Sequence, residues 1–255
     1  MNPYYDSGEV IIFHGDCREI LPQLAADPDC KYKYDFLLTD PPYGIEYDNT
    51  ESKHHNPKAA ARLLKTIIGD KDFDARQLES LSVPSIIWGA NCFASSLTDH
   101  PGWLTWLKTA TDHVASPSGR GVKLRKADME LAWTNFIRRP QAYIMFWIGV
   151  QFDEAIGKAG NEQHHPTCKP VELMKWCLDL APKECSTVLD PYMGGGSTLV
   201  AAAALTGWRG VGIELEERYC EMAANRLSRC DATCKVPRNY TGIGPSPKNS
   251  QPSLF

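Results

Sequence analysis

The sequence predicts an α/β fold in which a mostly parallel sheet carries helices on both faces. Short apolar runs alternate with amphipathic segments, as in chains whose strands are joined by crossover helices. Two of the apolar runs end in turns that carry an acid: Asp40-Pro41-Pro42-Tyr43, and Asp190-Pro191 with three glycines close behind. Open α/β sheets bind ligands at the carboxyl ends of their strands. We therefore expect both turns to belong to one ligand site.

Composition limits the alternatives. The 255 residues suit one large domain or a domain with a small insert, and 43% hydrophobic with 23% charged residues is typical of a soluble globular protein. The net charge is −4, so contact with nucleic acid would depend on local basic patches. Nine scattered cysteines indicate reduced thiols and a cytoplasmic location. We expect no metal site, no signal segment and no membrane span.

The first elements are a strand at 10–13 and a helix at 17–26. Asp16 is a good N-cap for this helix, because its carboxylate can accept a free N–H of the first turn. A second strand at 35–39 must stop at Asp40, because proline donates no hydrogen bond and restricts the residue before it. The turn then presents Asp40, the Pro41 carbonyl and the Tyr43 ring. When this stretch is considered alone, an ordinary proline-rich turn is an alternative interpretation.

The middle of the chain predicts further strands at 84–91, 103–107, 130–133 and 142–148, with short helices at 63–68 and 75–81. A long polar stretch at 45–62 is expected to form a loop beside the site. A second loop, 116–126, carries four positive charges in seven residues. It is either a solvated loop or one that contacts phosphates.

The last third is strand, glycine loop, helix, strand and acid. A strand at 187–190 leads into Gly194-Gly195-Gly196 and a helix to about 205, and a strand at 210–214 ends in Glu214. Glycines allow close approach of a ligand, and a helix N-terminus offers free N–H groups. Glu214 lies near the spacing at which an acid meets a ribose in dinucleotide folds. Amphipathic helices are expected at 171–181 and 218–229.

Four stretches together resemble the S-adenosylmethionine-dependent amino-methyltransferases of DNA, the adenine-N6/cytosine-N4 family. They are Asp40 to Tyr43, His165 to Pro170, Leu189 to Thr198 and Gly212 to Leu215, and the resemblance covers most of residues 9–229. It implies a doubly wound, Rossmann-like methyltransferase fold of the circularly permuted beta class, with the catalytic half before the cofactor-glycine half. Segments 86–93 and 130–133 resemble the small phage and prophage branch. The implied organisation is one domain, 1–230, with a compact target-recognition insert at about 112–163 and a flexible tail, 231–255.

The resemblance also implies S-adenosylmethionine as cofactor. Glu214 would hold the ribose, Asp16 would lie near the adenine amine, and Lys169 would pack by the carboxylate end. Tyr192 and Cys92 depart from the commoner Phe and Tyr of the family. The full set implied for the cofactor is Asp16, Cys17, Asp40, Thr167, Lys169, Asp190, Pro191, Met193, Gly194, Gly196, Ser197, Thr198 and Glu214.

Asp40, Pro41, Pro42 and Tyr43 would form the catalytic turn, with Tyr43 stacked on a flipped base. An acid at the first position goes mostly with adenine in the family, so N6 of adenine in DNA is the expected target. Cytosine N4, an RNA or protein amine, and a binding protein with an inactive site remain alternatives. Trp133 is either a second stacking face or a core residue. The residues expected to contact nucleic acid are Tyr43, Arg120, Lys123, Arg125, Lys126, Trp133, Arg138 and Arg139.

The expected partner is double-stranded DNA in a bacterial or phage-encoded methylation system, with or without a restriction partner. The chain ends in Gln251-Pro252-Ser253-Leu254-Phe255, which resembles the short peptide that docks on the bacterial sliding clamp. A match of five residues also arises by chance. A homodimer is a further expectation.

Overall fold

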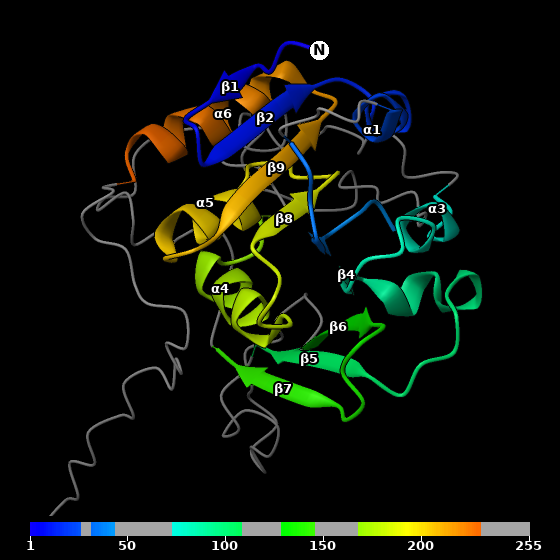
Figure 1. Ribbon diagram of the computed structural model, residues 1–255. Coiled ribbons are helices and arrows are strands. Elements are labelled where there is room, and N and C mark those ends of the chain that lie inside the picture. Colours follow the sequence, from blue (N-terminus) through cyan, green and yellow to red (C-terminus); the bar gives the residue numbers. More distant parts are fainter. Residues whose placement is uncertain (27–31, 44–72, 109–128, 146–167, 231–255) are drawn as a thin grey trace, which may run out of the picture.

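The computed structural model describes residues 1–26, 32–43, 73–108, 129–145 and 168–230 (Figure 1). Nine strands form one sheet in the order β1-β2-β9-β8-β3-β4-β6-β5-β7. Their bounds are β1 Tyr5–Asp6, β2 Val10–His14, β3 Phe36–Thr39, β4 Ser85–Trp88, β5 Trp103–Leu107, β6 Met129–Thr134, β7 Gln141–Ile144, β8 Thr187–Asp190 and β9 Arg209–Glu214. The helices are α1 Cys17–Ala26, α3 Arg76–Glu79, α4 Val171–Leu180, α5 Ser197–Ala204 and α6 Glu217–Ser228, with 3-10 turns at Ala90–Cys92 and Ala94–Ser96.

The centre of the sheet is parallel. Strands β2, β9, β8, β3 and β4 pair in parallel, whereas β1 pairs antiparallel with β2, and β6 pairs antiparallel with both β4 and β5. Central parallel strands are buried on both faces, which explains why β3 and β4 are buried along their whole length.

Helices cover both faces of the sheet. One face packs against α4, α5 and α6 through two apolar clusters. The first cluster includes Leu38, Trp106 and Leu173, and the second includes Ile12 and Leu199. The other face packs against α1 and α3 through a cluster around Leu37, Ile87 and Trp133. Figure 1 shows these helices on opposite sides of the sheet. The predicted doubly wound, mostly parallel α/β fold is therefore confirmed.

The local predictions hold closely. Helix α1 begins where Asp16 caps it, with the Arg18 N–H donating to the Asp16 carboxylate at 2.9 Å. The strands and helices predicted within the described residues are all present, and their ends differ by a few residues at most places. The helix expected at 63–68, the loops at 45–62 and 116–126 and the tail at 231–255 lie outside the described residues.

The segment expected to be a target-recognition insert, about 112–163, is described only at its centre. That centre contains β6 and β7, which are strands of the main sheet and not a separate unit. Cys17, Cys177 and Cys220 are buried free thiols. Among the described residues, no helix is long and apolar enough to cross a membrane, and no group of His, Cys, Asp and Glu side chains could hold a metal ion.

Candidate functional site

The two acid-bearing turns lie side by side because β3 and β8 are neighbours. Phe36 pairs with Val188 and Leu37 with Leu189, so both strands end at the same edge of the sheet. The connection after β8 runs through α5 on one face, and the connection after β3 runs through α3 on the other. The edge between β3 and β8 is therefore a topological switch point, where open α/β sheets form a binding crevice.

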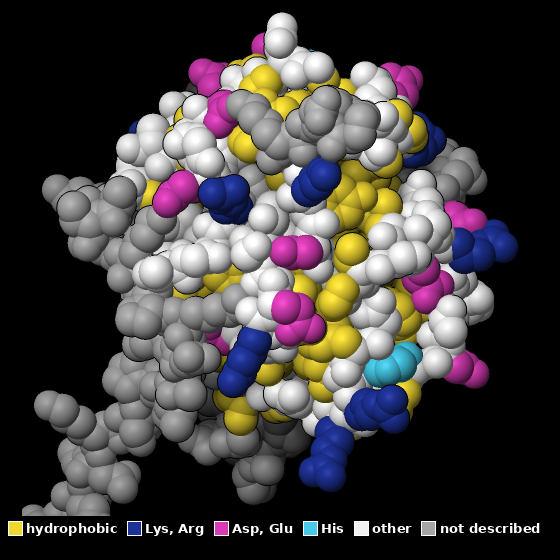
Figure 2. All heavy atoms as spheres, viewed as in Figure 1, with side chains coloured by type: hydrophobic (Ala, Val, Ile, Leu, Met, Phe, Trp, Pro, Cys, Tyr) yellow, Lys and Arg dark blue, Asp and Glu magenta, His cyan; other side chains and the backbone are white. Residues whose placement is uncertain are grey.

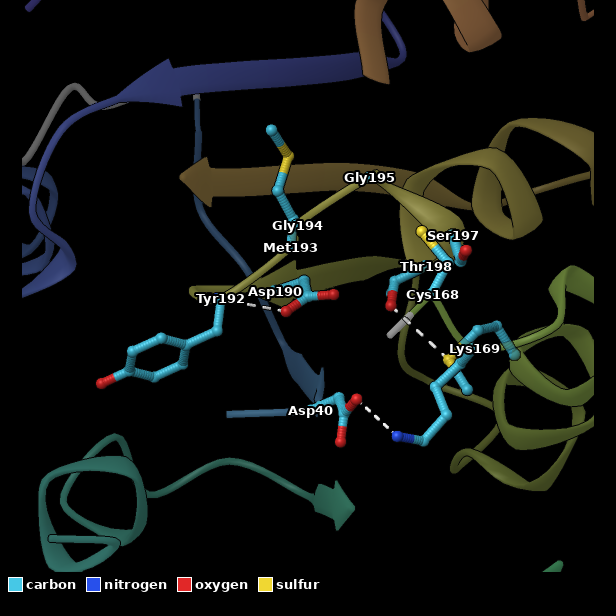
Figure 3. A pocket seen from close by; sticks show the side chains of 11 residues that line it. Asp40, Cys168, Lys169, Asp190, Tyr192, Met193, Gly194, Gly195, Ser197 and Thr198 are labelled. Atoms are coloured by element: carbon cyan, nitrogen blue, oxygen red, sulfur yellow. Dashed lines mark hydrogen bonds and ion pairs between the residues drawn. The ribbon is translucent and has the colours of Figure 1, made fainter. Parts of the chain in front are cut away.

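A pocket opens at this switch point, drawn in Figure 3. Both strand ends contribute a carboxylate to it, Asp40 and Asp190, and in this view Asp190 lies between Asp40 and the glycine turn. The residues that line the pocket are Asp40, Cys168, Lys169, Met174, Asp190, Tyr192, Met193, Gly194, Gly195, Ser197 and Thr198. Seven of these residues were predicted from the sequence as catalytic or cofactor-binding: Asp40, Lys169, Asp190, Met193, Gly194, Ser197 and Thr198.

The glycine turn is held in one shape by its backbone. Gly194 and Gly196 have φ of 49° and 77°, a region that side chains other than glycine rarely adopt. A Cβ on Gly196 would lie 2.7 Å from the Cβ of Ala223 on α6. Arg226, also on α6, donates to the Gly195 carbonyl and lies 3.3 Å from the Ser197 hydroxyl. Helix α6 thus holds the glycine turn in place through Ala223 and Arg226, which were not predicted from the sequence.

Asp190 is almost completely buried below this turn, with an exposed fraction of 3%. The Thr39 hydroxyl donates to it at 2.7 Å and the Tyr192 N–H at 3.2 Å. Burial nevertheless raises the pKa of Asp190 to about 6, because desolvation outweighs these hydrogen bonds. A nearby positive charge would therefore stabilise the ionised form of Asp190.

Glu214, at the end of β9, ties its strand to the glycine turn. It accepts the Gly194 N–H at 3.0 Å and the Glu216 N–H at 2.8 Å. Burial raises its pKa in spite of these two donors. The carboxylate therefore lies beside the turn, although it does not line the pocket.

Asp40 is held by two side chains on its two oxygens. The Tyr43 hydroxyl donates to Oδ1 at 2.6 Å, and the Lys169 ammonium donates to Oδ2. A carboxylate has about four lone-pair sites, so each oxygen keeps one for a further donor. Desolvation, and then the charge of Asp40, raise the pKa of Tyr43 well above its usual value, so the phenol stays protonated as a donor.

The position of the Tyr43 ring depends on Gly89, which follows β4. A Cβ on Gly89 would lie only 1.9 Å from Cε1 of the Tyr43 ring, and Gly89 itself has φ of 71°. The absence of a side chain at residue 89 therefore makes room for the ring. The predicted stacking of Tyr43 on a base remains a prediction.

Lys169, which the sequence placed at the cofactor's carboxylate end, also contacts the catalytic turn. Its ammonium binds Asp40, lies 3.0 Å from Glu130 Oε2 and donates to the Tyr43 hydroxyl at 3.1 Å. Glu130 and its second partner, Lys108, were not predicted as site residues. The signal in the sequence was an acid within the otherwise apolar strand Met129–Thr134.

Several predicted residues lie away from the pocket lining. Asp16 pairs with Arg18 at 2.5 Å, and Cys17 is buried at the start of α1. Pro191, Gly196 and Glu214 shape the turn without lining the pocket. Thr167 is outside the described residues.

The predicted contact of Trp133 with nucleic acid is corrected by its burial. Trp133 is 2% exposed, its indole N–H donates to the Thr98 carbonyl at 3.0 Å, and it packs in the core on the α1 and α3 face. No ring face is left for a base, so Trp133 is a core residue.

The basic residues predicted to contact nucleic acid divide into two groups. Arg138 and Arg139 are exposed between β6 and β7, as such contacts require. Arg120, Lys123, Arg125 and Lys126 lie outside the described residues. On the face in Figure 2, the described Lys and Arg side chains are interspersed with Asp and Glu.

Comparison with known proteins gives one family and several relatives. A family model described as DNA methylase, of the N6/N4 type, matches residues 116–225. The Escherichia coli K12 protein YubD, whose name carries the word methylase, is 26% identical over 233 residues, which are 84% of this chain and 88% of YubD. The type II methyltransferase M.ScaI of Streptomyces caespitosus is 22% identical over 88% of this chain and 83% of its own length.

Solved structures are similar at the level of the fold. The cytosine-N4-specific PvuII DNA methyltransferase matches with a TM-score of 0.51 and 12% identity, over 88% of each chain. The M1.HpyAVI complex with SAM covers 86% of this chain and 99% of its own, with 19% identity and a TM-score of 0.47.

Proposed function

We propose that this chain, which belongs to the adenine-N6/cytosine-N4 family of DNA amino-methyltransferases, methylates N6 of adenine in DNA with S-adenosylmethionine as donor. One observation carries the proposal: the Asp40 turn and the glycine turn end neighbouring strands and line one pocket. The site has one half suited to a methyl donor and one half suited to an amine.

The donor set of the glycine half fits S-adenosylmethionine. S-adenosylmethionine, when bound, would supply a sulfonium whose S–CH3 bond breaks as the amine nitrogen takes the methyl group, and the sulfur would leave as a neutral thioether. Buried Asp190 suits a cationic neighbour, because burial disfavours its negative charge and raises its pKa. Gly194 and Gly195 line the same pocket without side chains, so a ligand can approach their backbone closely. The Glu214 carboxylate would accept hydrogen bonds from the ribose hydroxyls.

Asp40 supplies the chemistry of the amine half. The lone pair of an exocyclic base amine is shared with the ring, which makes the amine a weak nucleophile. Two acceptors aimed at its two N–H groups, the Asp40 carboxylate and the Pro41 carbonyl, favour the tetrahedral geometry that frees the lone pair. The methylated ammonium is a strong acid and can give its proton to Asp40. Positioning and electrostatics carry most of the rate enhancement in this scheme.

A base inside a duplex cannot reach this pocket, so the proposal requires the target nucleotide to be flipped out of the helix. Arg138 and Arg139 are exposed and suited to contact phosphates. The choice of adenine over cytosine rests on the aspartate at the first position of the turn, which in the family that the chain resembles goes mostly with adenine.

The test is transfer of labelled methyl from S-adenosylmethionine to duplex DNA, followed by nuclease digestion to identify the methylated base. We expect N6-methyladenine. Label on cytosine N4 would keep the family and refute the adenine assignment. Parallel reactions with RNA and with protein are the comparison, and label in either of these but not in DNA would refute DNA as substrate.

Two partners complete the proposal. The peptide Gln251–Phe255, outside the described residues, would tether the enzyme to the sliding clamp and raise its effective concentration at replicated DNA. A labelled peptide of residues 246–255 should bind the clamp in a fluorescence titration, and absence of saturable binding at high micromolar clamp would refute this. A homodimer would be recognised by its mass in light scattering.

A further inference from the structure

A chain of opposite charges runs from the catalytic turn to the antiparallel end of the sheet. It begins with Tyr43 and Asp40, continues through Lys169 to Glu130, and ends at Lys108. The side chains of Lys169 and Lys108 are 7% and 13% exposed, and those of Asp40 and Glu130 are 21% and 23% exposed. Ion pairs this far from solvent are weakly screened, so each member strongly affects its neighbours.

Lys169 is the centre of this chain. Three oxygens surround its ammonium, which donates hydrogen bonds to Asp40 Oδ2 and the Tyr43 hydroxyl and forms an ion pair of 3.0 Å with Glu130 Oε2. Asp40 and Tyr43 come from one side, the turn after β3. Glu130 comes from β6, so it is the partner that fixes the ammonium from a separate element.

Glu130 is itself held in place. It lies opposite Trp106 in the antiparallel pairing of β5 and β6, and Lys108, just past the end of β5, binds its Oε1. The Lys108 ammonium in turn lies 4.8 Å above the Trp106 ring. Two rigid strands therefore set the position of the Glu130 carboxylate.

We propose that Glu130 is a positioning residue, which holds Lys169 against Asp40 and thereby fixes the plane of the carboxylate that accepts the target amine. The inference rests on the proposed function, since it assigns Asp40 the role of amine acceptor. Tyr43 and Lys169 occupy one lone-pair site on each Asp40 oxygen, so the sites left for the amine have a fixed direction. Such orientation of an acceptor is a recognised source of rate enhancement.

The charge of Lys169 provides a pH signature. Burial lowers its pKa, but the negative charges of Asp40 and Glu130, with the neighbouring Tyr43 hydroxyl, together outweigh burial and hold the pKa well above its usual value. Cys177 on α4 also faces Lys169, and Lys108 lies beyond Glu130. Without the Glu130 charge, Lys169 should lose its proton at a lower pH, and Asp40 would then lose its cationic partner.

The experiment compares the wild-type protein with E130Q, which keeps the size of the side chain and removes its charge. E172Q is the matched control, because Glu172 forms an exposed ion pair with Lys175 at 2.7 Å on α4. The double variant K108M/E130Q removes one charge of each sign. It keeps the test possible if E130Q alone fails to fold because Lys108 and Lys169 are left as two buried cations. Each protein is assayed for S-adenosylmethionine affinity, for kcat of methyl transfer across pH, and by crystal structure.

For E130Q and for the double variant we expect kcat to fall about tenfold to a hundredfold, with cofactor affinity close to wild type. The alkaline decline of kcat should begin at a lower pH than in the wild-type protein, and Lys169 should move off Asp40 in the crystal. E172Q should match wild type.

Three results would overturn the inference: kcat of E130Q within about twofold of wild type, full recovery in K108M/E130Q, or Lys169 unmoved with an unshifted pH profile. Full recovery would mean that Glu130 only neutralises Lys108. If the wild-type protein methylates no substrate, the proposed function fails, and the position of Lys169 in the wild-type and E130Q crystals then decides the inference alone.

Discussion

The substitution Gly89→Ala tests whether the Tyr43 ring must lie where the structure places it. The new Cβ would lie 1.9 Å from Cε1 and 2.5 Å from Cδ1 and Cζ of that ring, far inside van der Waals contact. Ring and backbone cannot both stay in place. The ring must move by more than an ångström to restore ordinary contact, and this movement breaks the 2.6 Å hydrogen bond from its hydroxyl to Asp40.

The expected loss of folding stability in Gly89→Ala has two parts. Alanine at φ of 71° costs about 1–2 kcal/mol of backbone strain. Loss of a hydrogen bond to a charged group adds about 1.5–3 kcal/mol. Gly207→Ala separates the parts, because Gly207 has φ of 83° and open space around its would-be Cβ. This control therefore carries the backbone cost alone, which lowers the melting temperature by about 2–8 °C in a protein of this size.

The assay measures melting temperature, S-adenosylmethionine affinity and kcat of methyl transfer for both variants. We expect Gly89→Ala to melt below Gly207→Ala and to lose about a hundredfold in kcat, because Asp40 is no longer held in its orientation. Gly207→Ala should keep the wild-type kcat. Equal kcat in the two variants would refute the view that Tyr43 positions Asp40.

Two further predictions concern the cofactor half. Burial raises the pKa of Asp190 from its ordinary 3.8 to about 6, so the folded protein binds the extra proton and the cofactor-free protein should lose about 3 kcal/mol of stability as pH rises from about 4 to 6. Denaturant unfolding of the wild-type protein and of Asp190→Asn, measured across this pH range, isolates the contribution of Asp190 to stability. The same pH dependence of stability in both proteins would contradict the prediction. Arg226→Ala should weaken S-adenosylmethionine binding about tenfold in calorimetry, because one side chain holds both the Gly195 carbonyl and Ser197. Arg229→Ala, at the exposed residue directly after the same helix, is the control, and equal affinities would show that Arg226 does not support the turn.

The strand ends and turns could be predicted from sequence because local chemistry sets them. Proline stops β3 at Thr39, Asp16 caps α1, and the glycines open α5, each within a few residues of its cause. The expectation that the Asp40 and Asp190 turns share one site came from the usual place of ligands at the carboxyl ends of parallel strands and from the family resemblance. The pairing of β3 with β8 places both turns at one edge of the sheet.

The supports of the site could not be anticipated, because they come from elements that are far apart in the chain. Glu130 meets Lys108 through the pairing of β5 with β6, and it meets Lys169 because the segment before α4 approaches β6. Trp133 illustrates the converse. An aromatic residue near the end of a strand suits a stacking role or a core role equally well, and only the packing of α1 and α3 on its face decides for the core.

The most direct measurement is methyl transfer and cofactor binding on the same Asp40→Ala protein. If Asp40 is the amine acceptor and the glycine turn holds the donor, labelled transfer to DNA should vanish while S-adenosylmethionine still binds with nearly wild-type affinity. Circular dichroism should show an intact fold. Undiminished methyl transfer by Asp40→Ala would contradict the account.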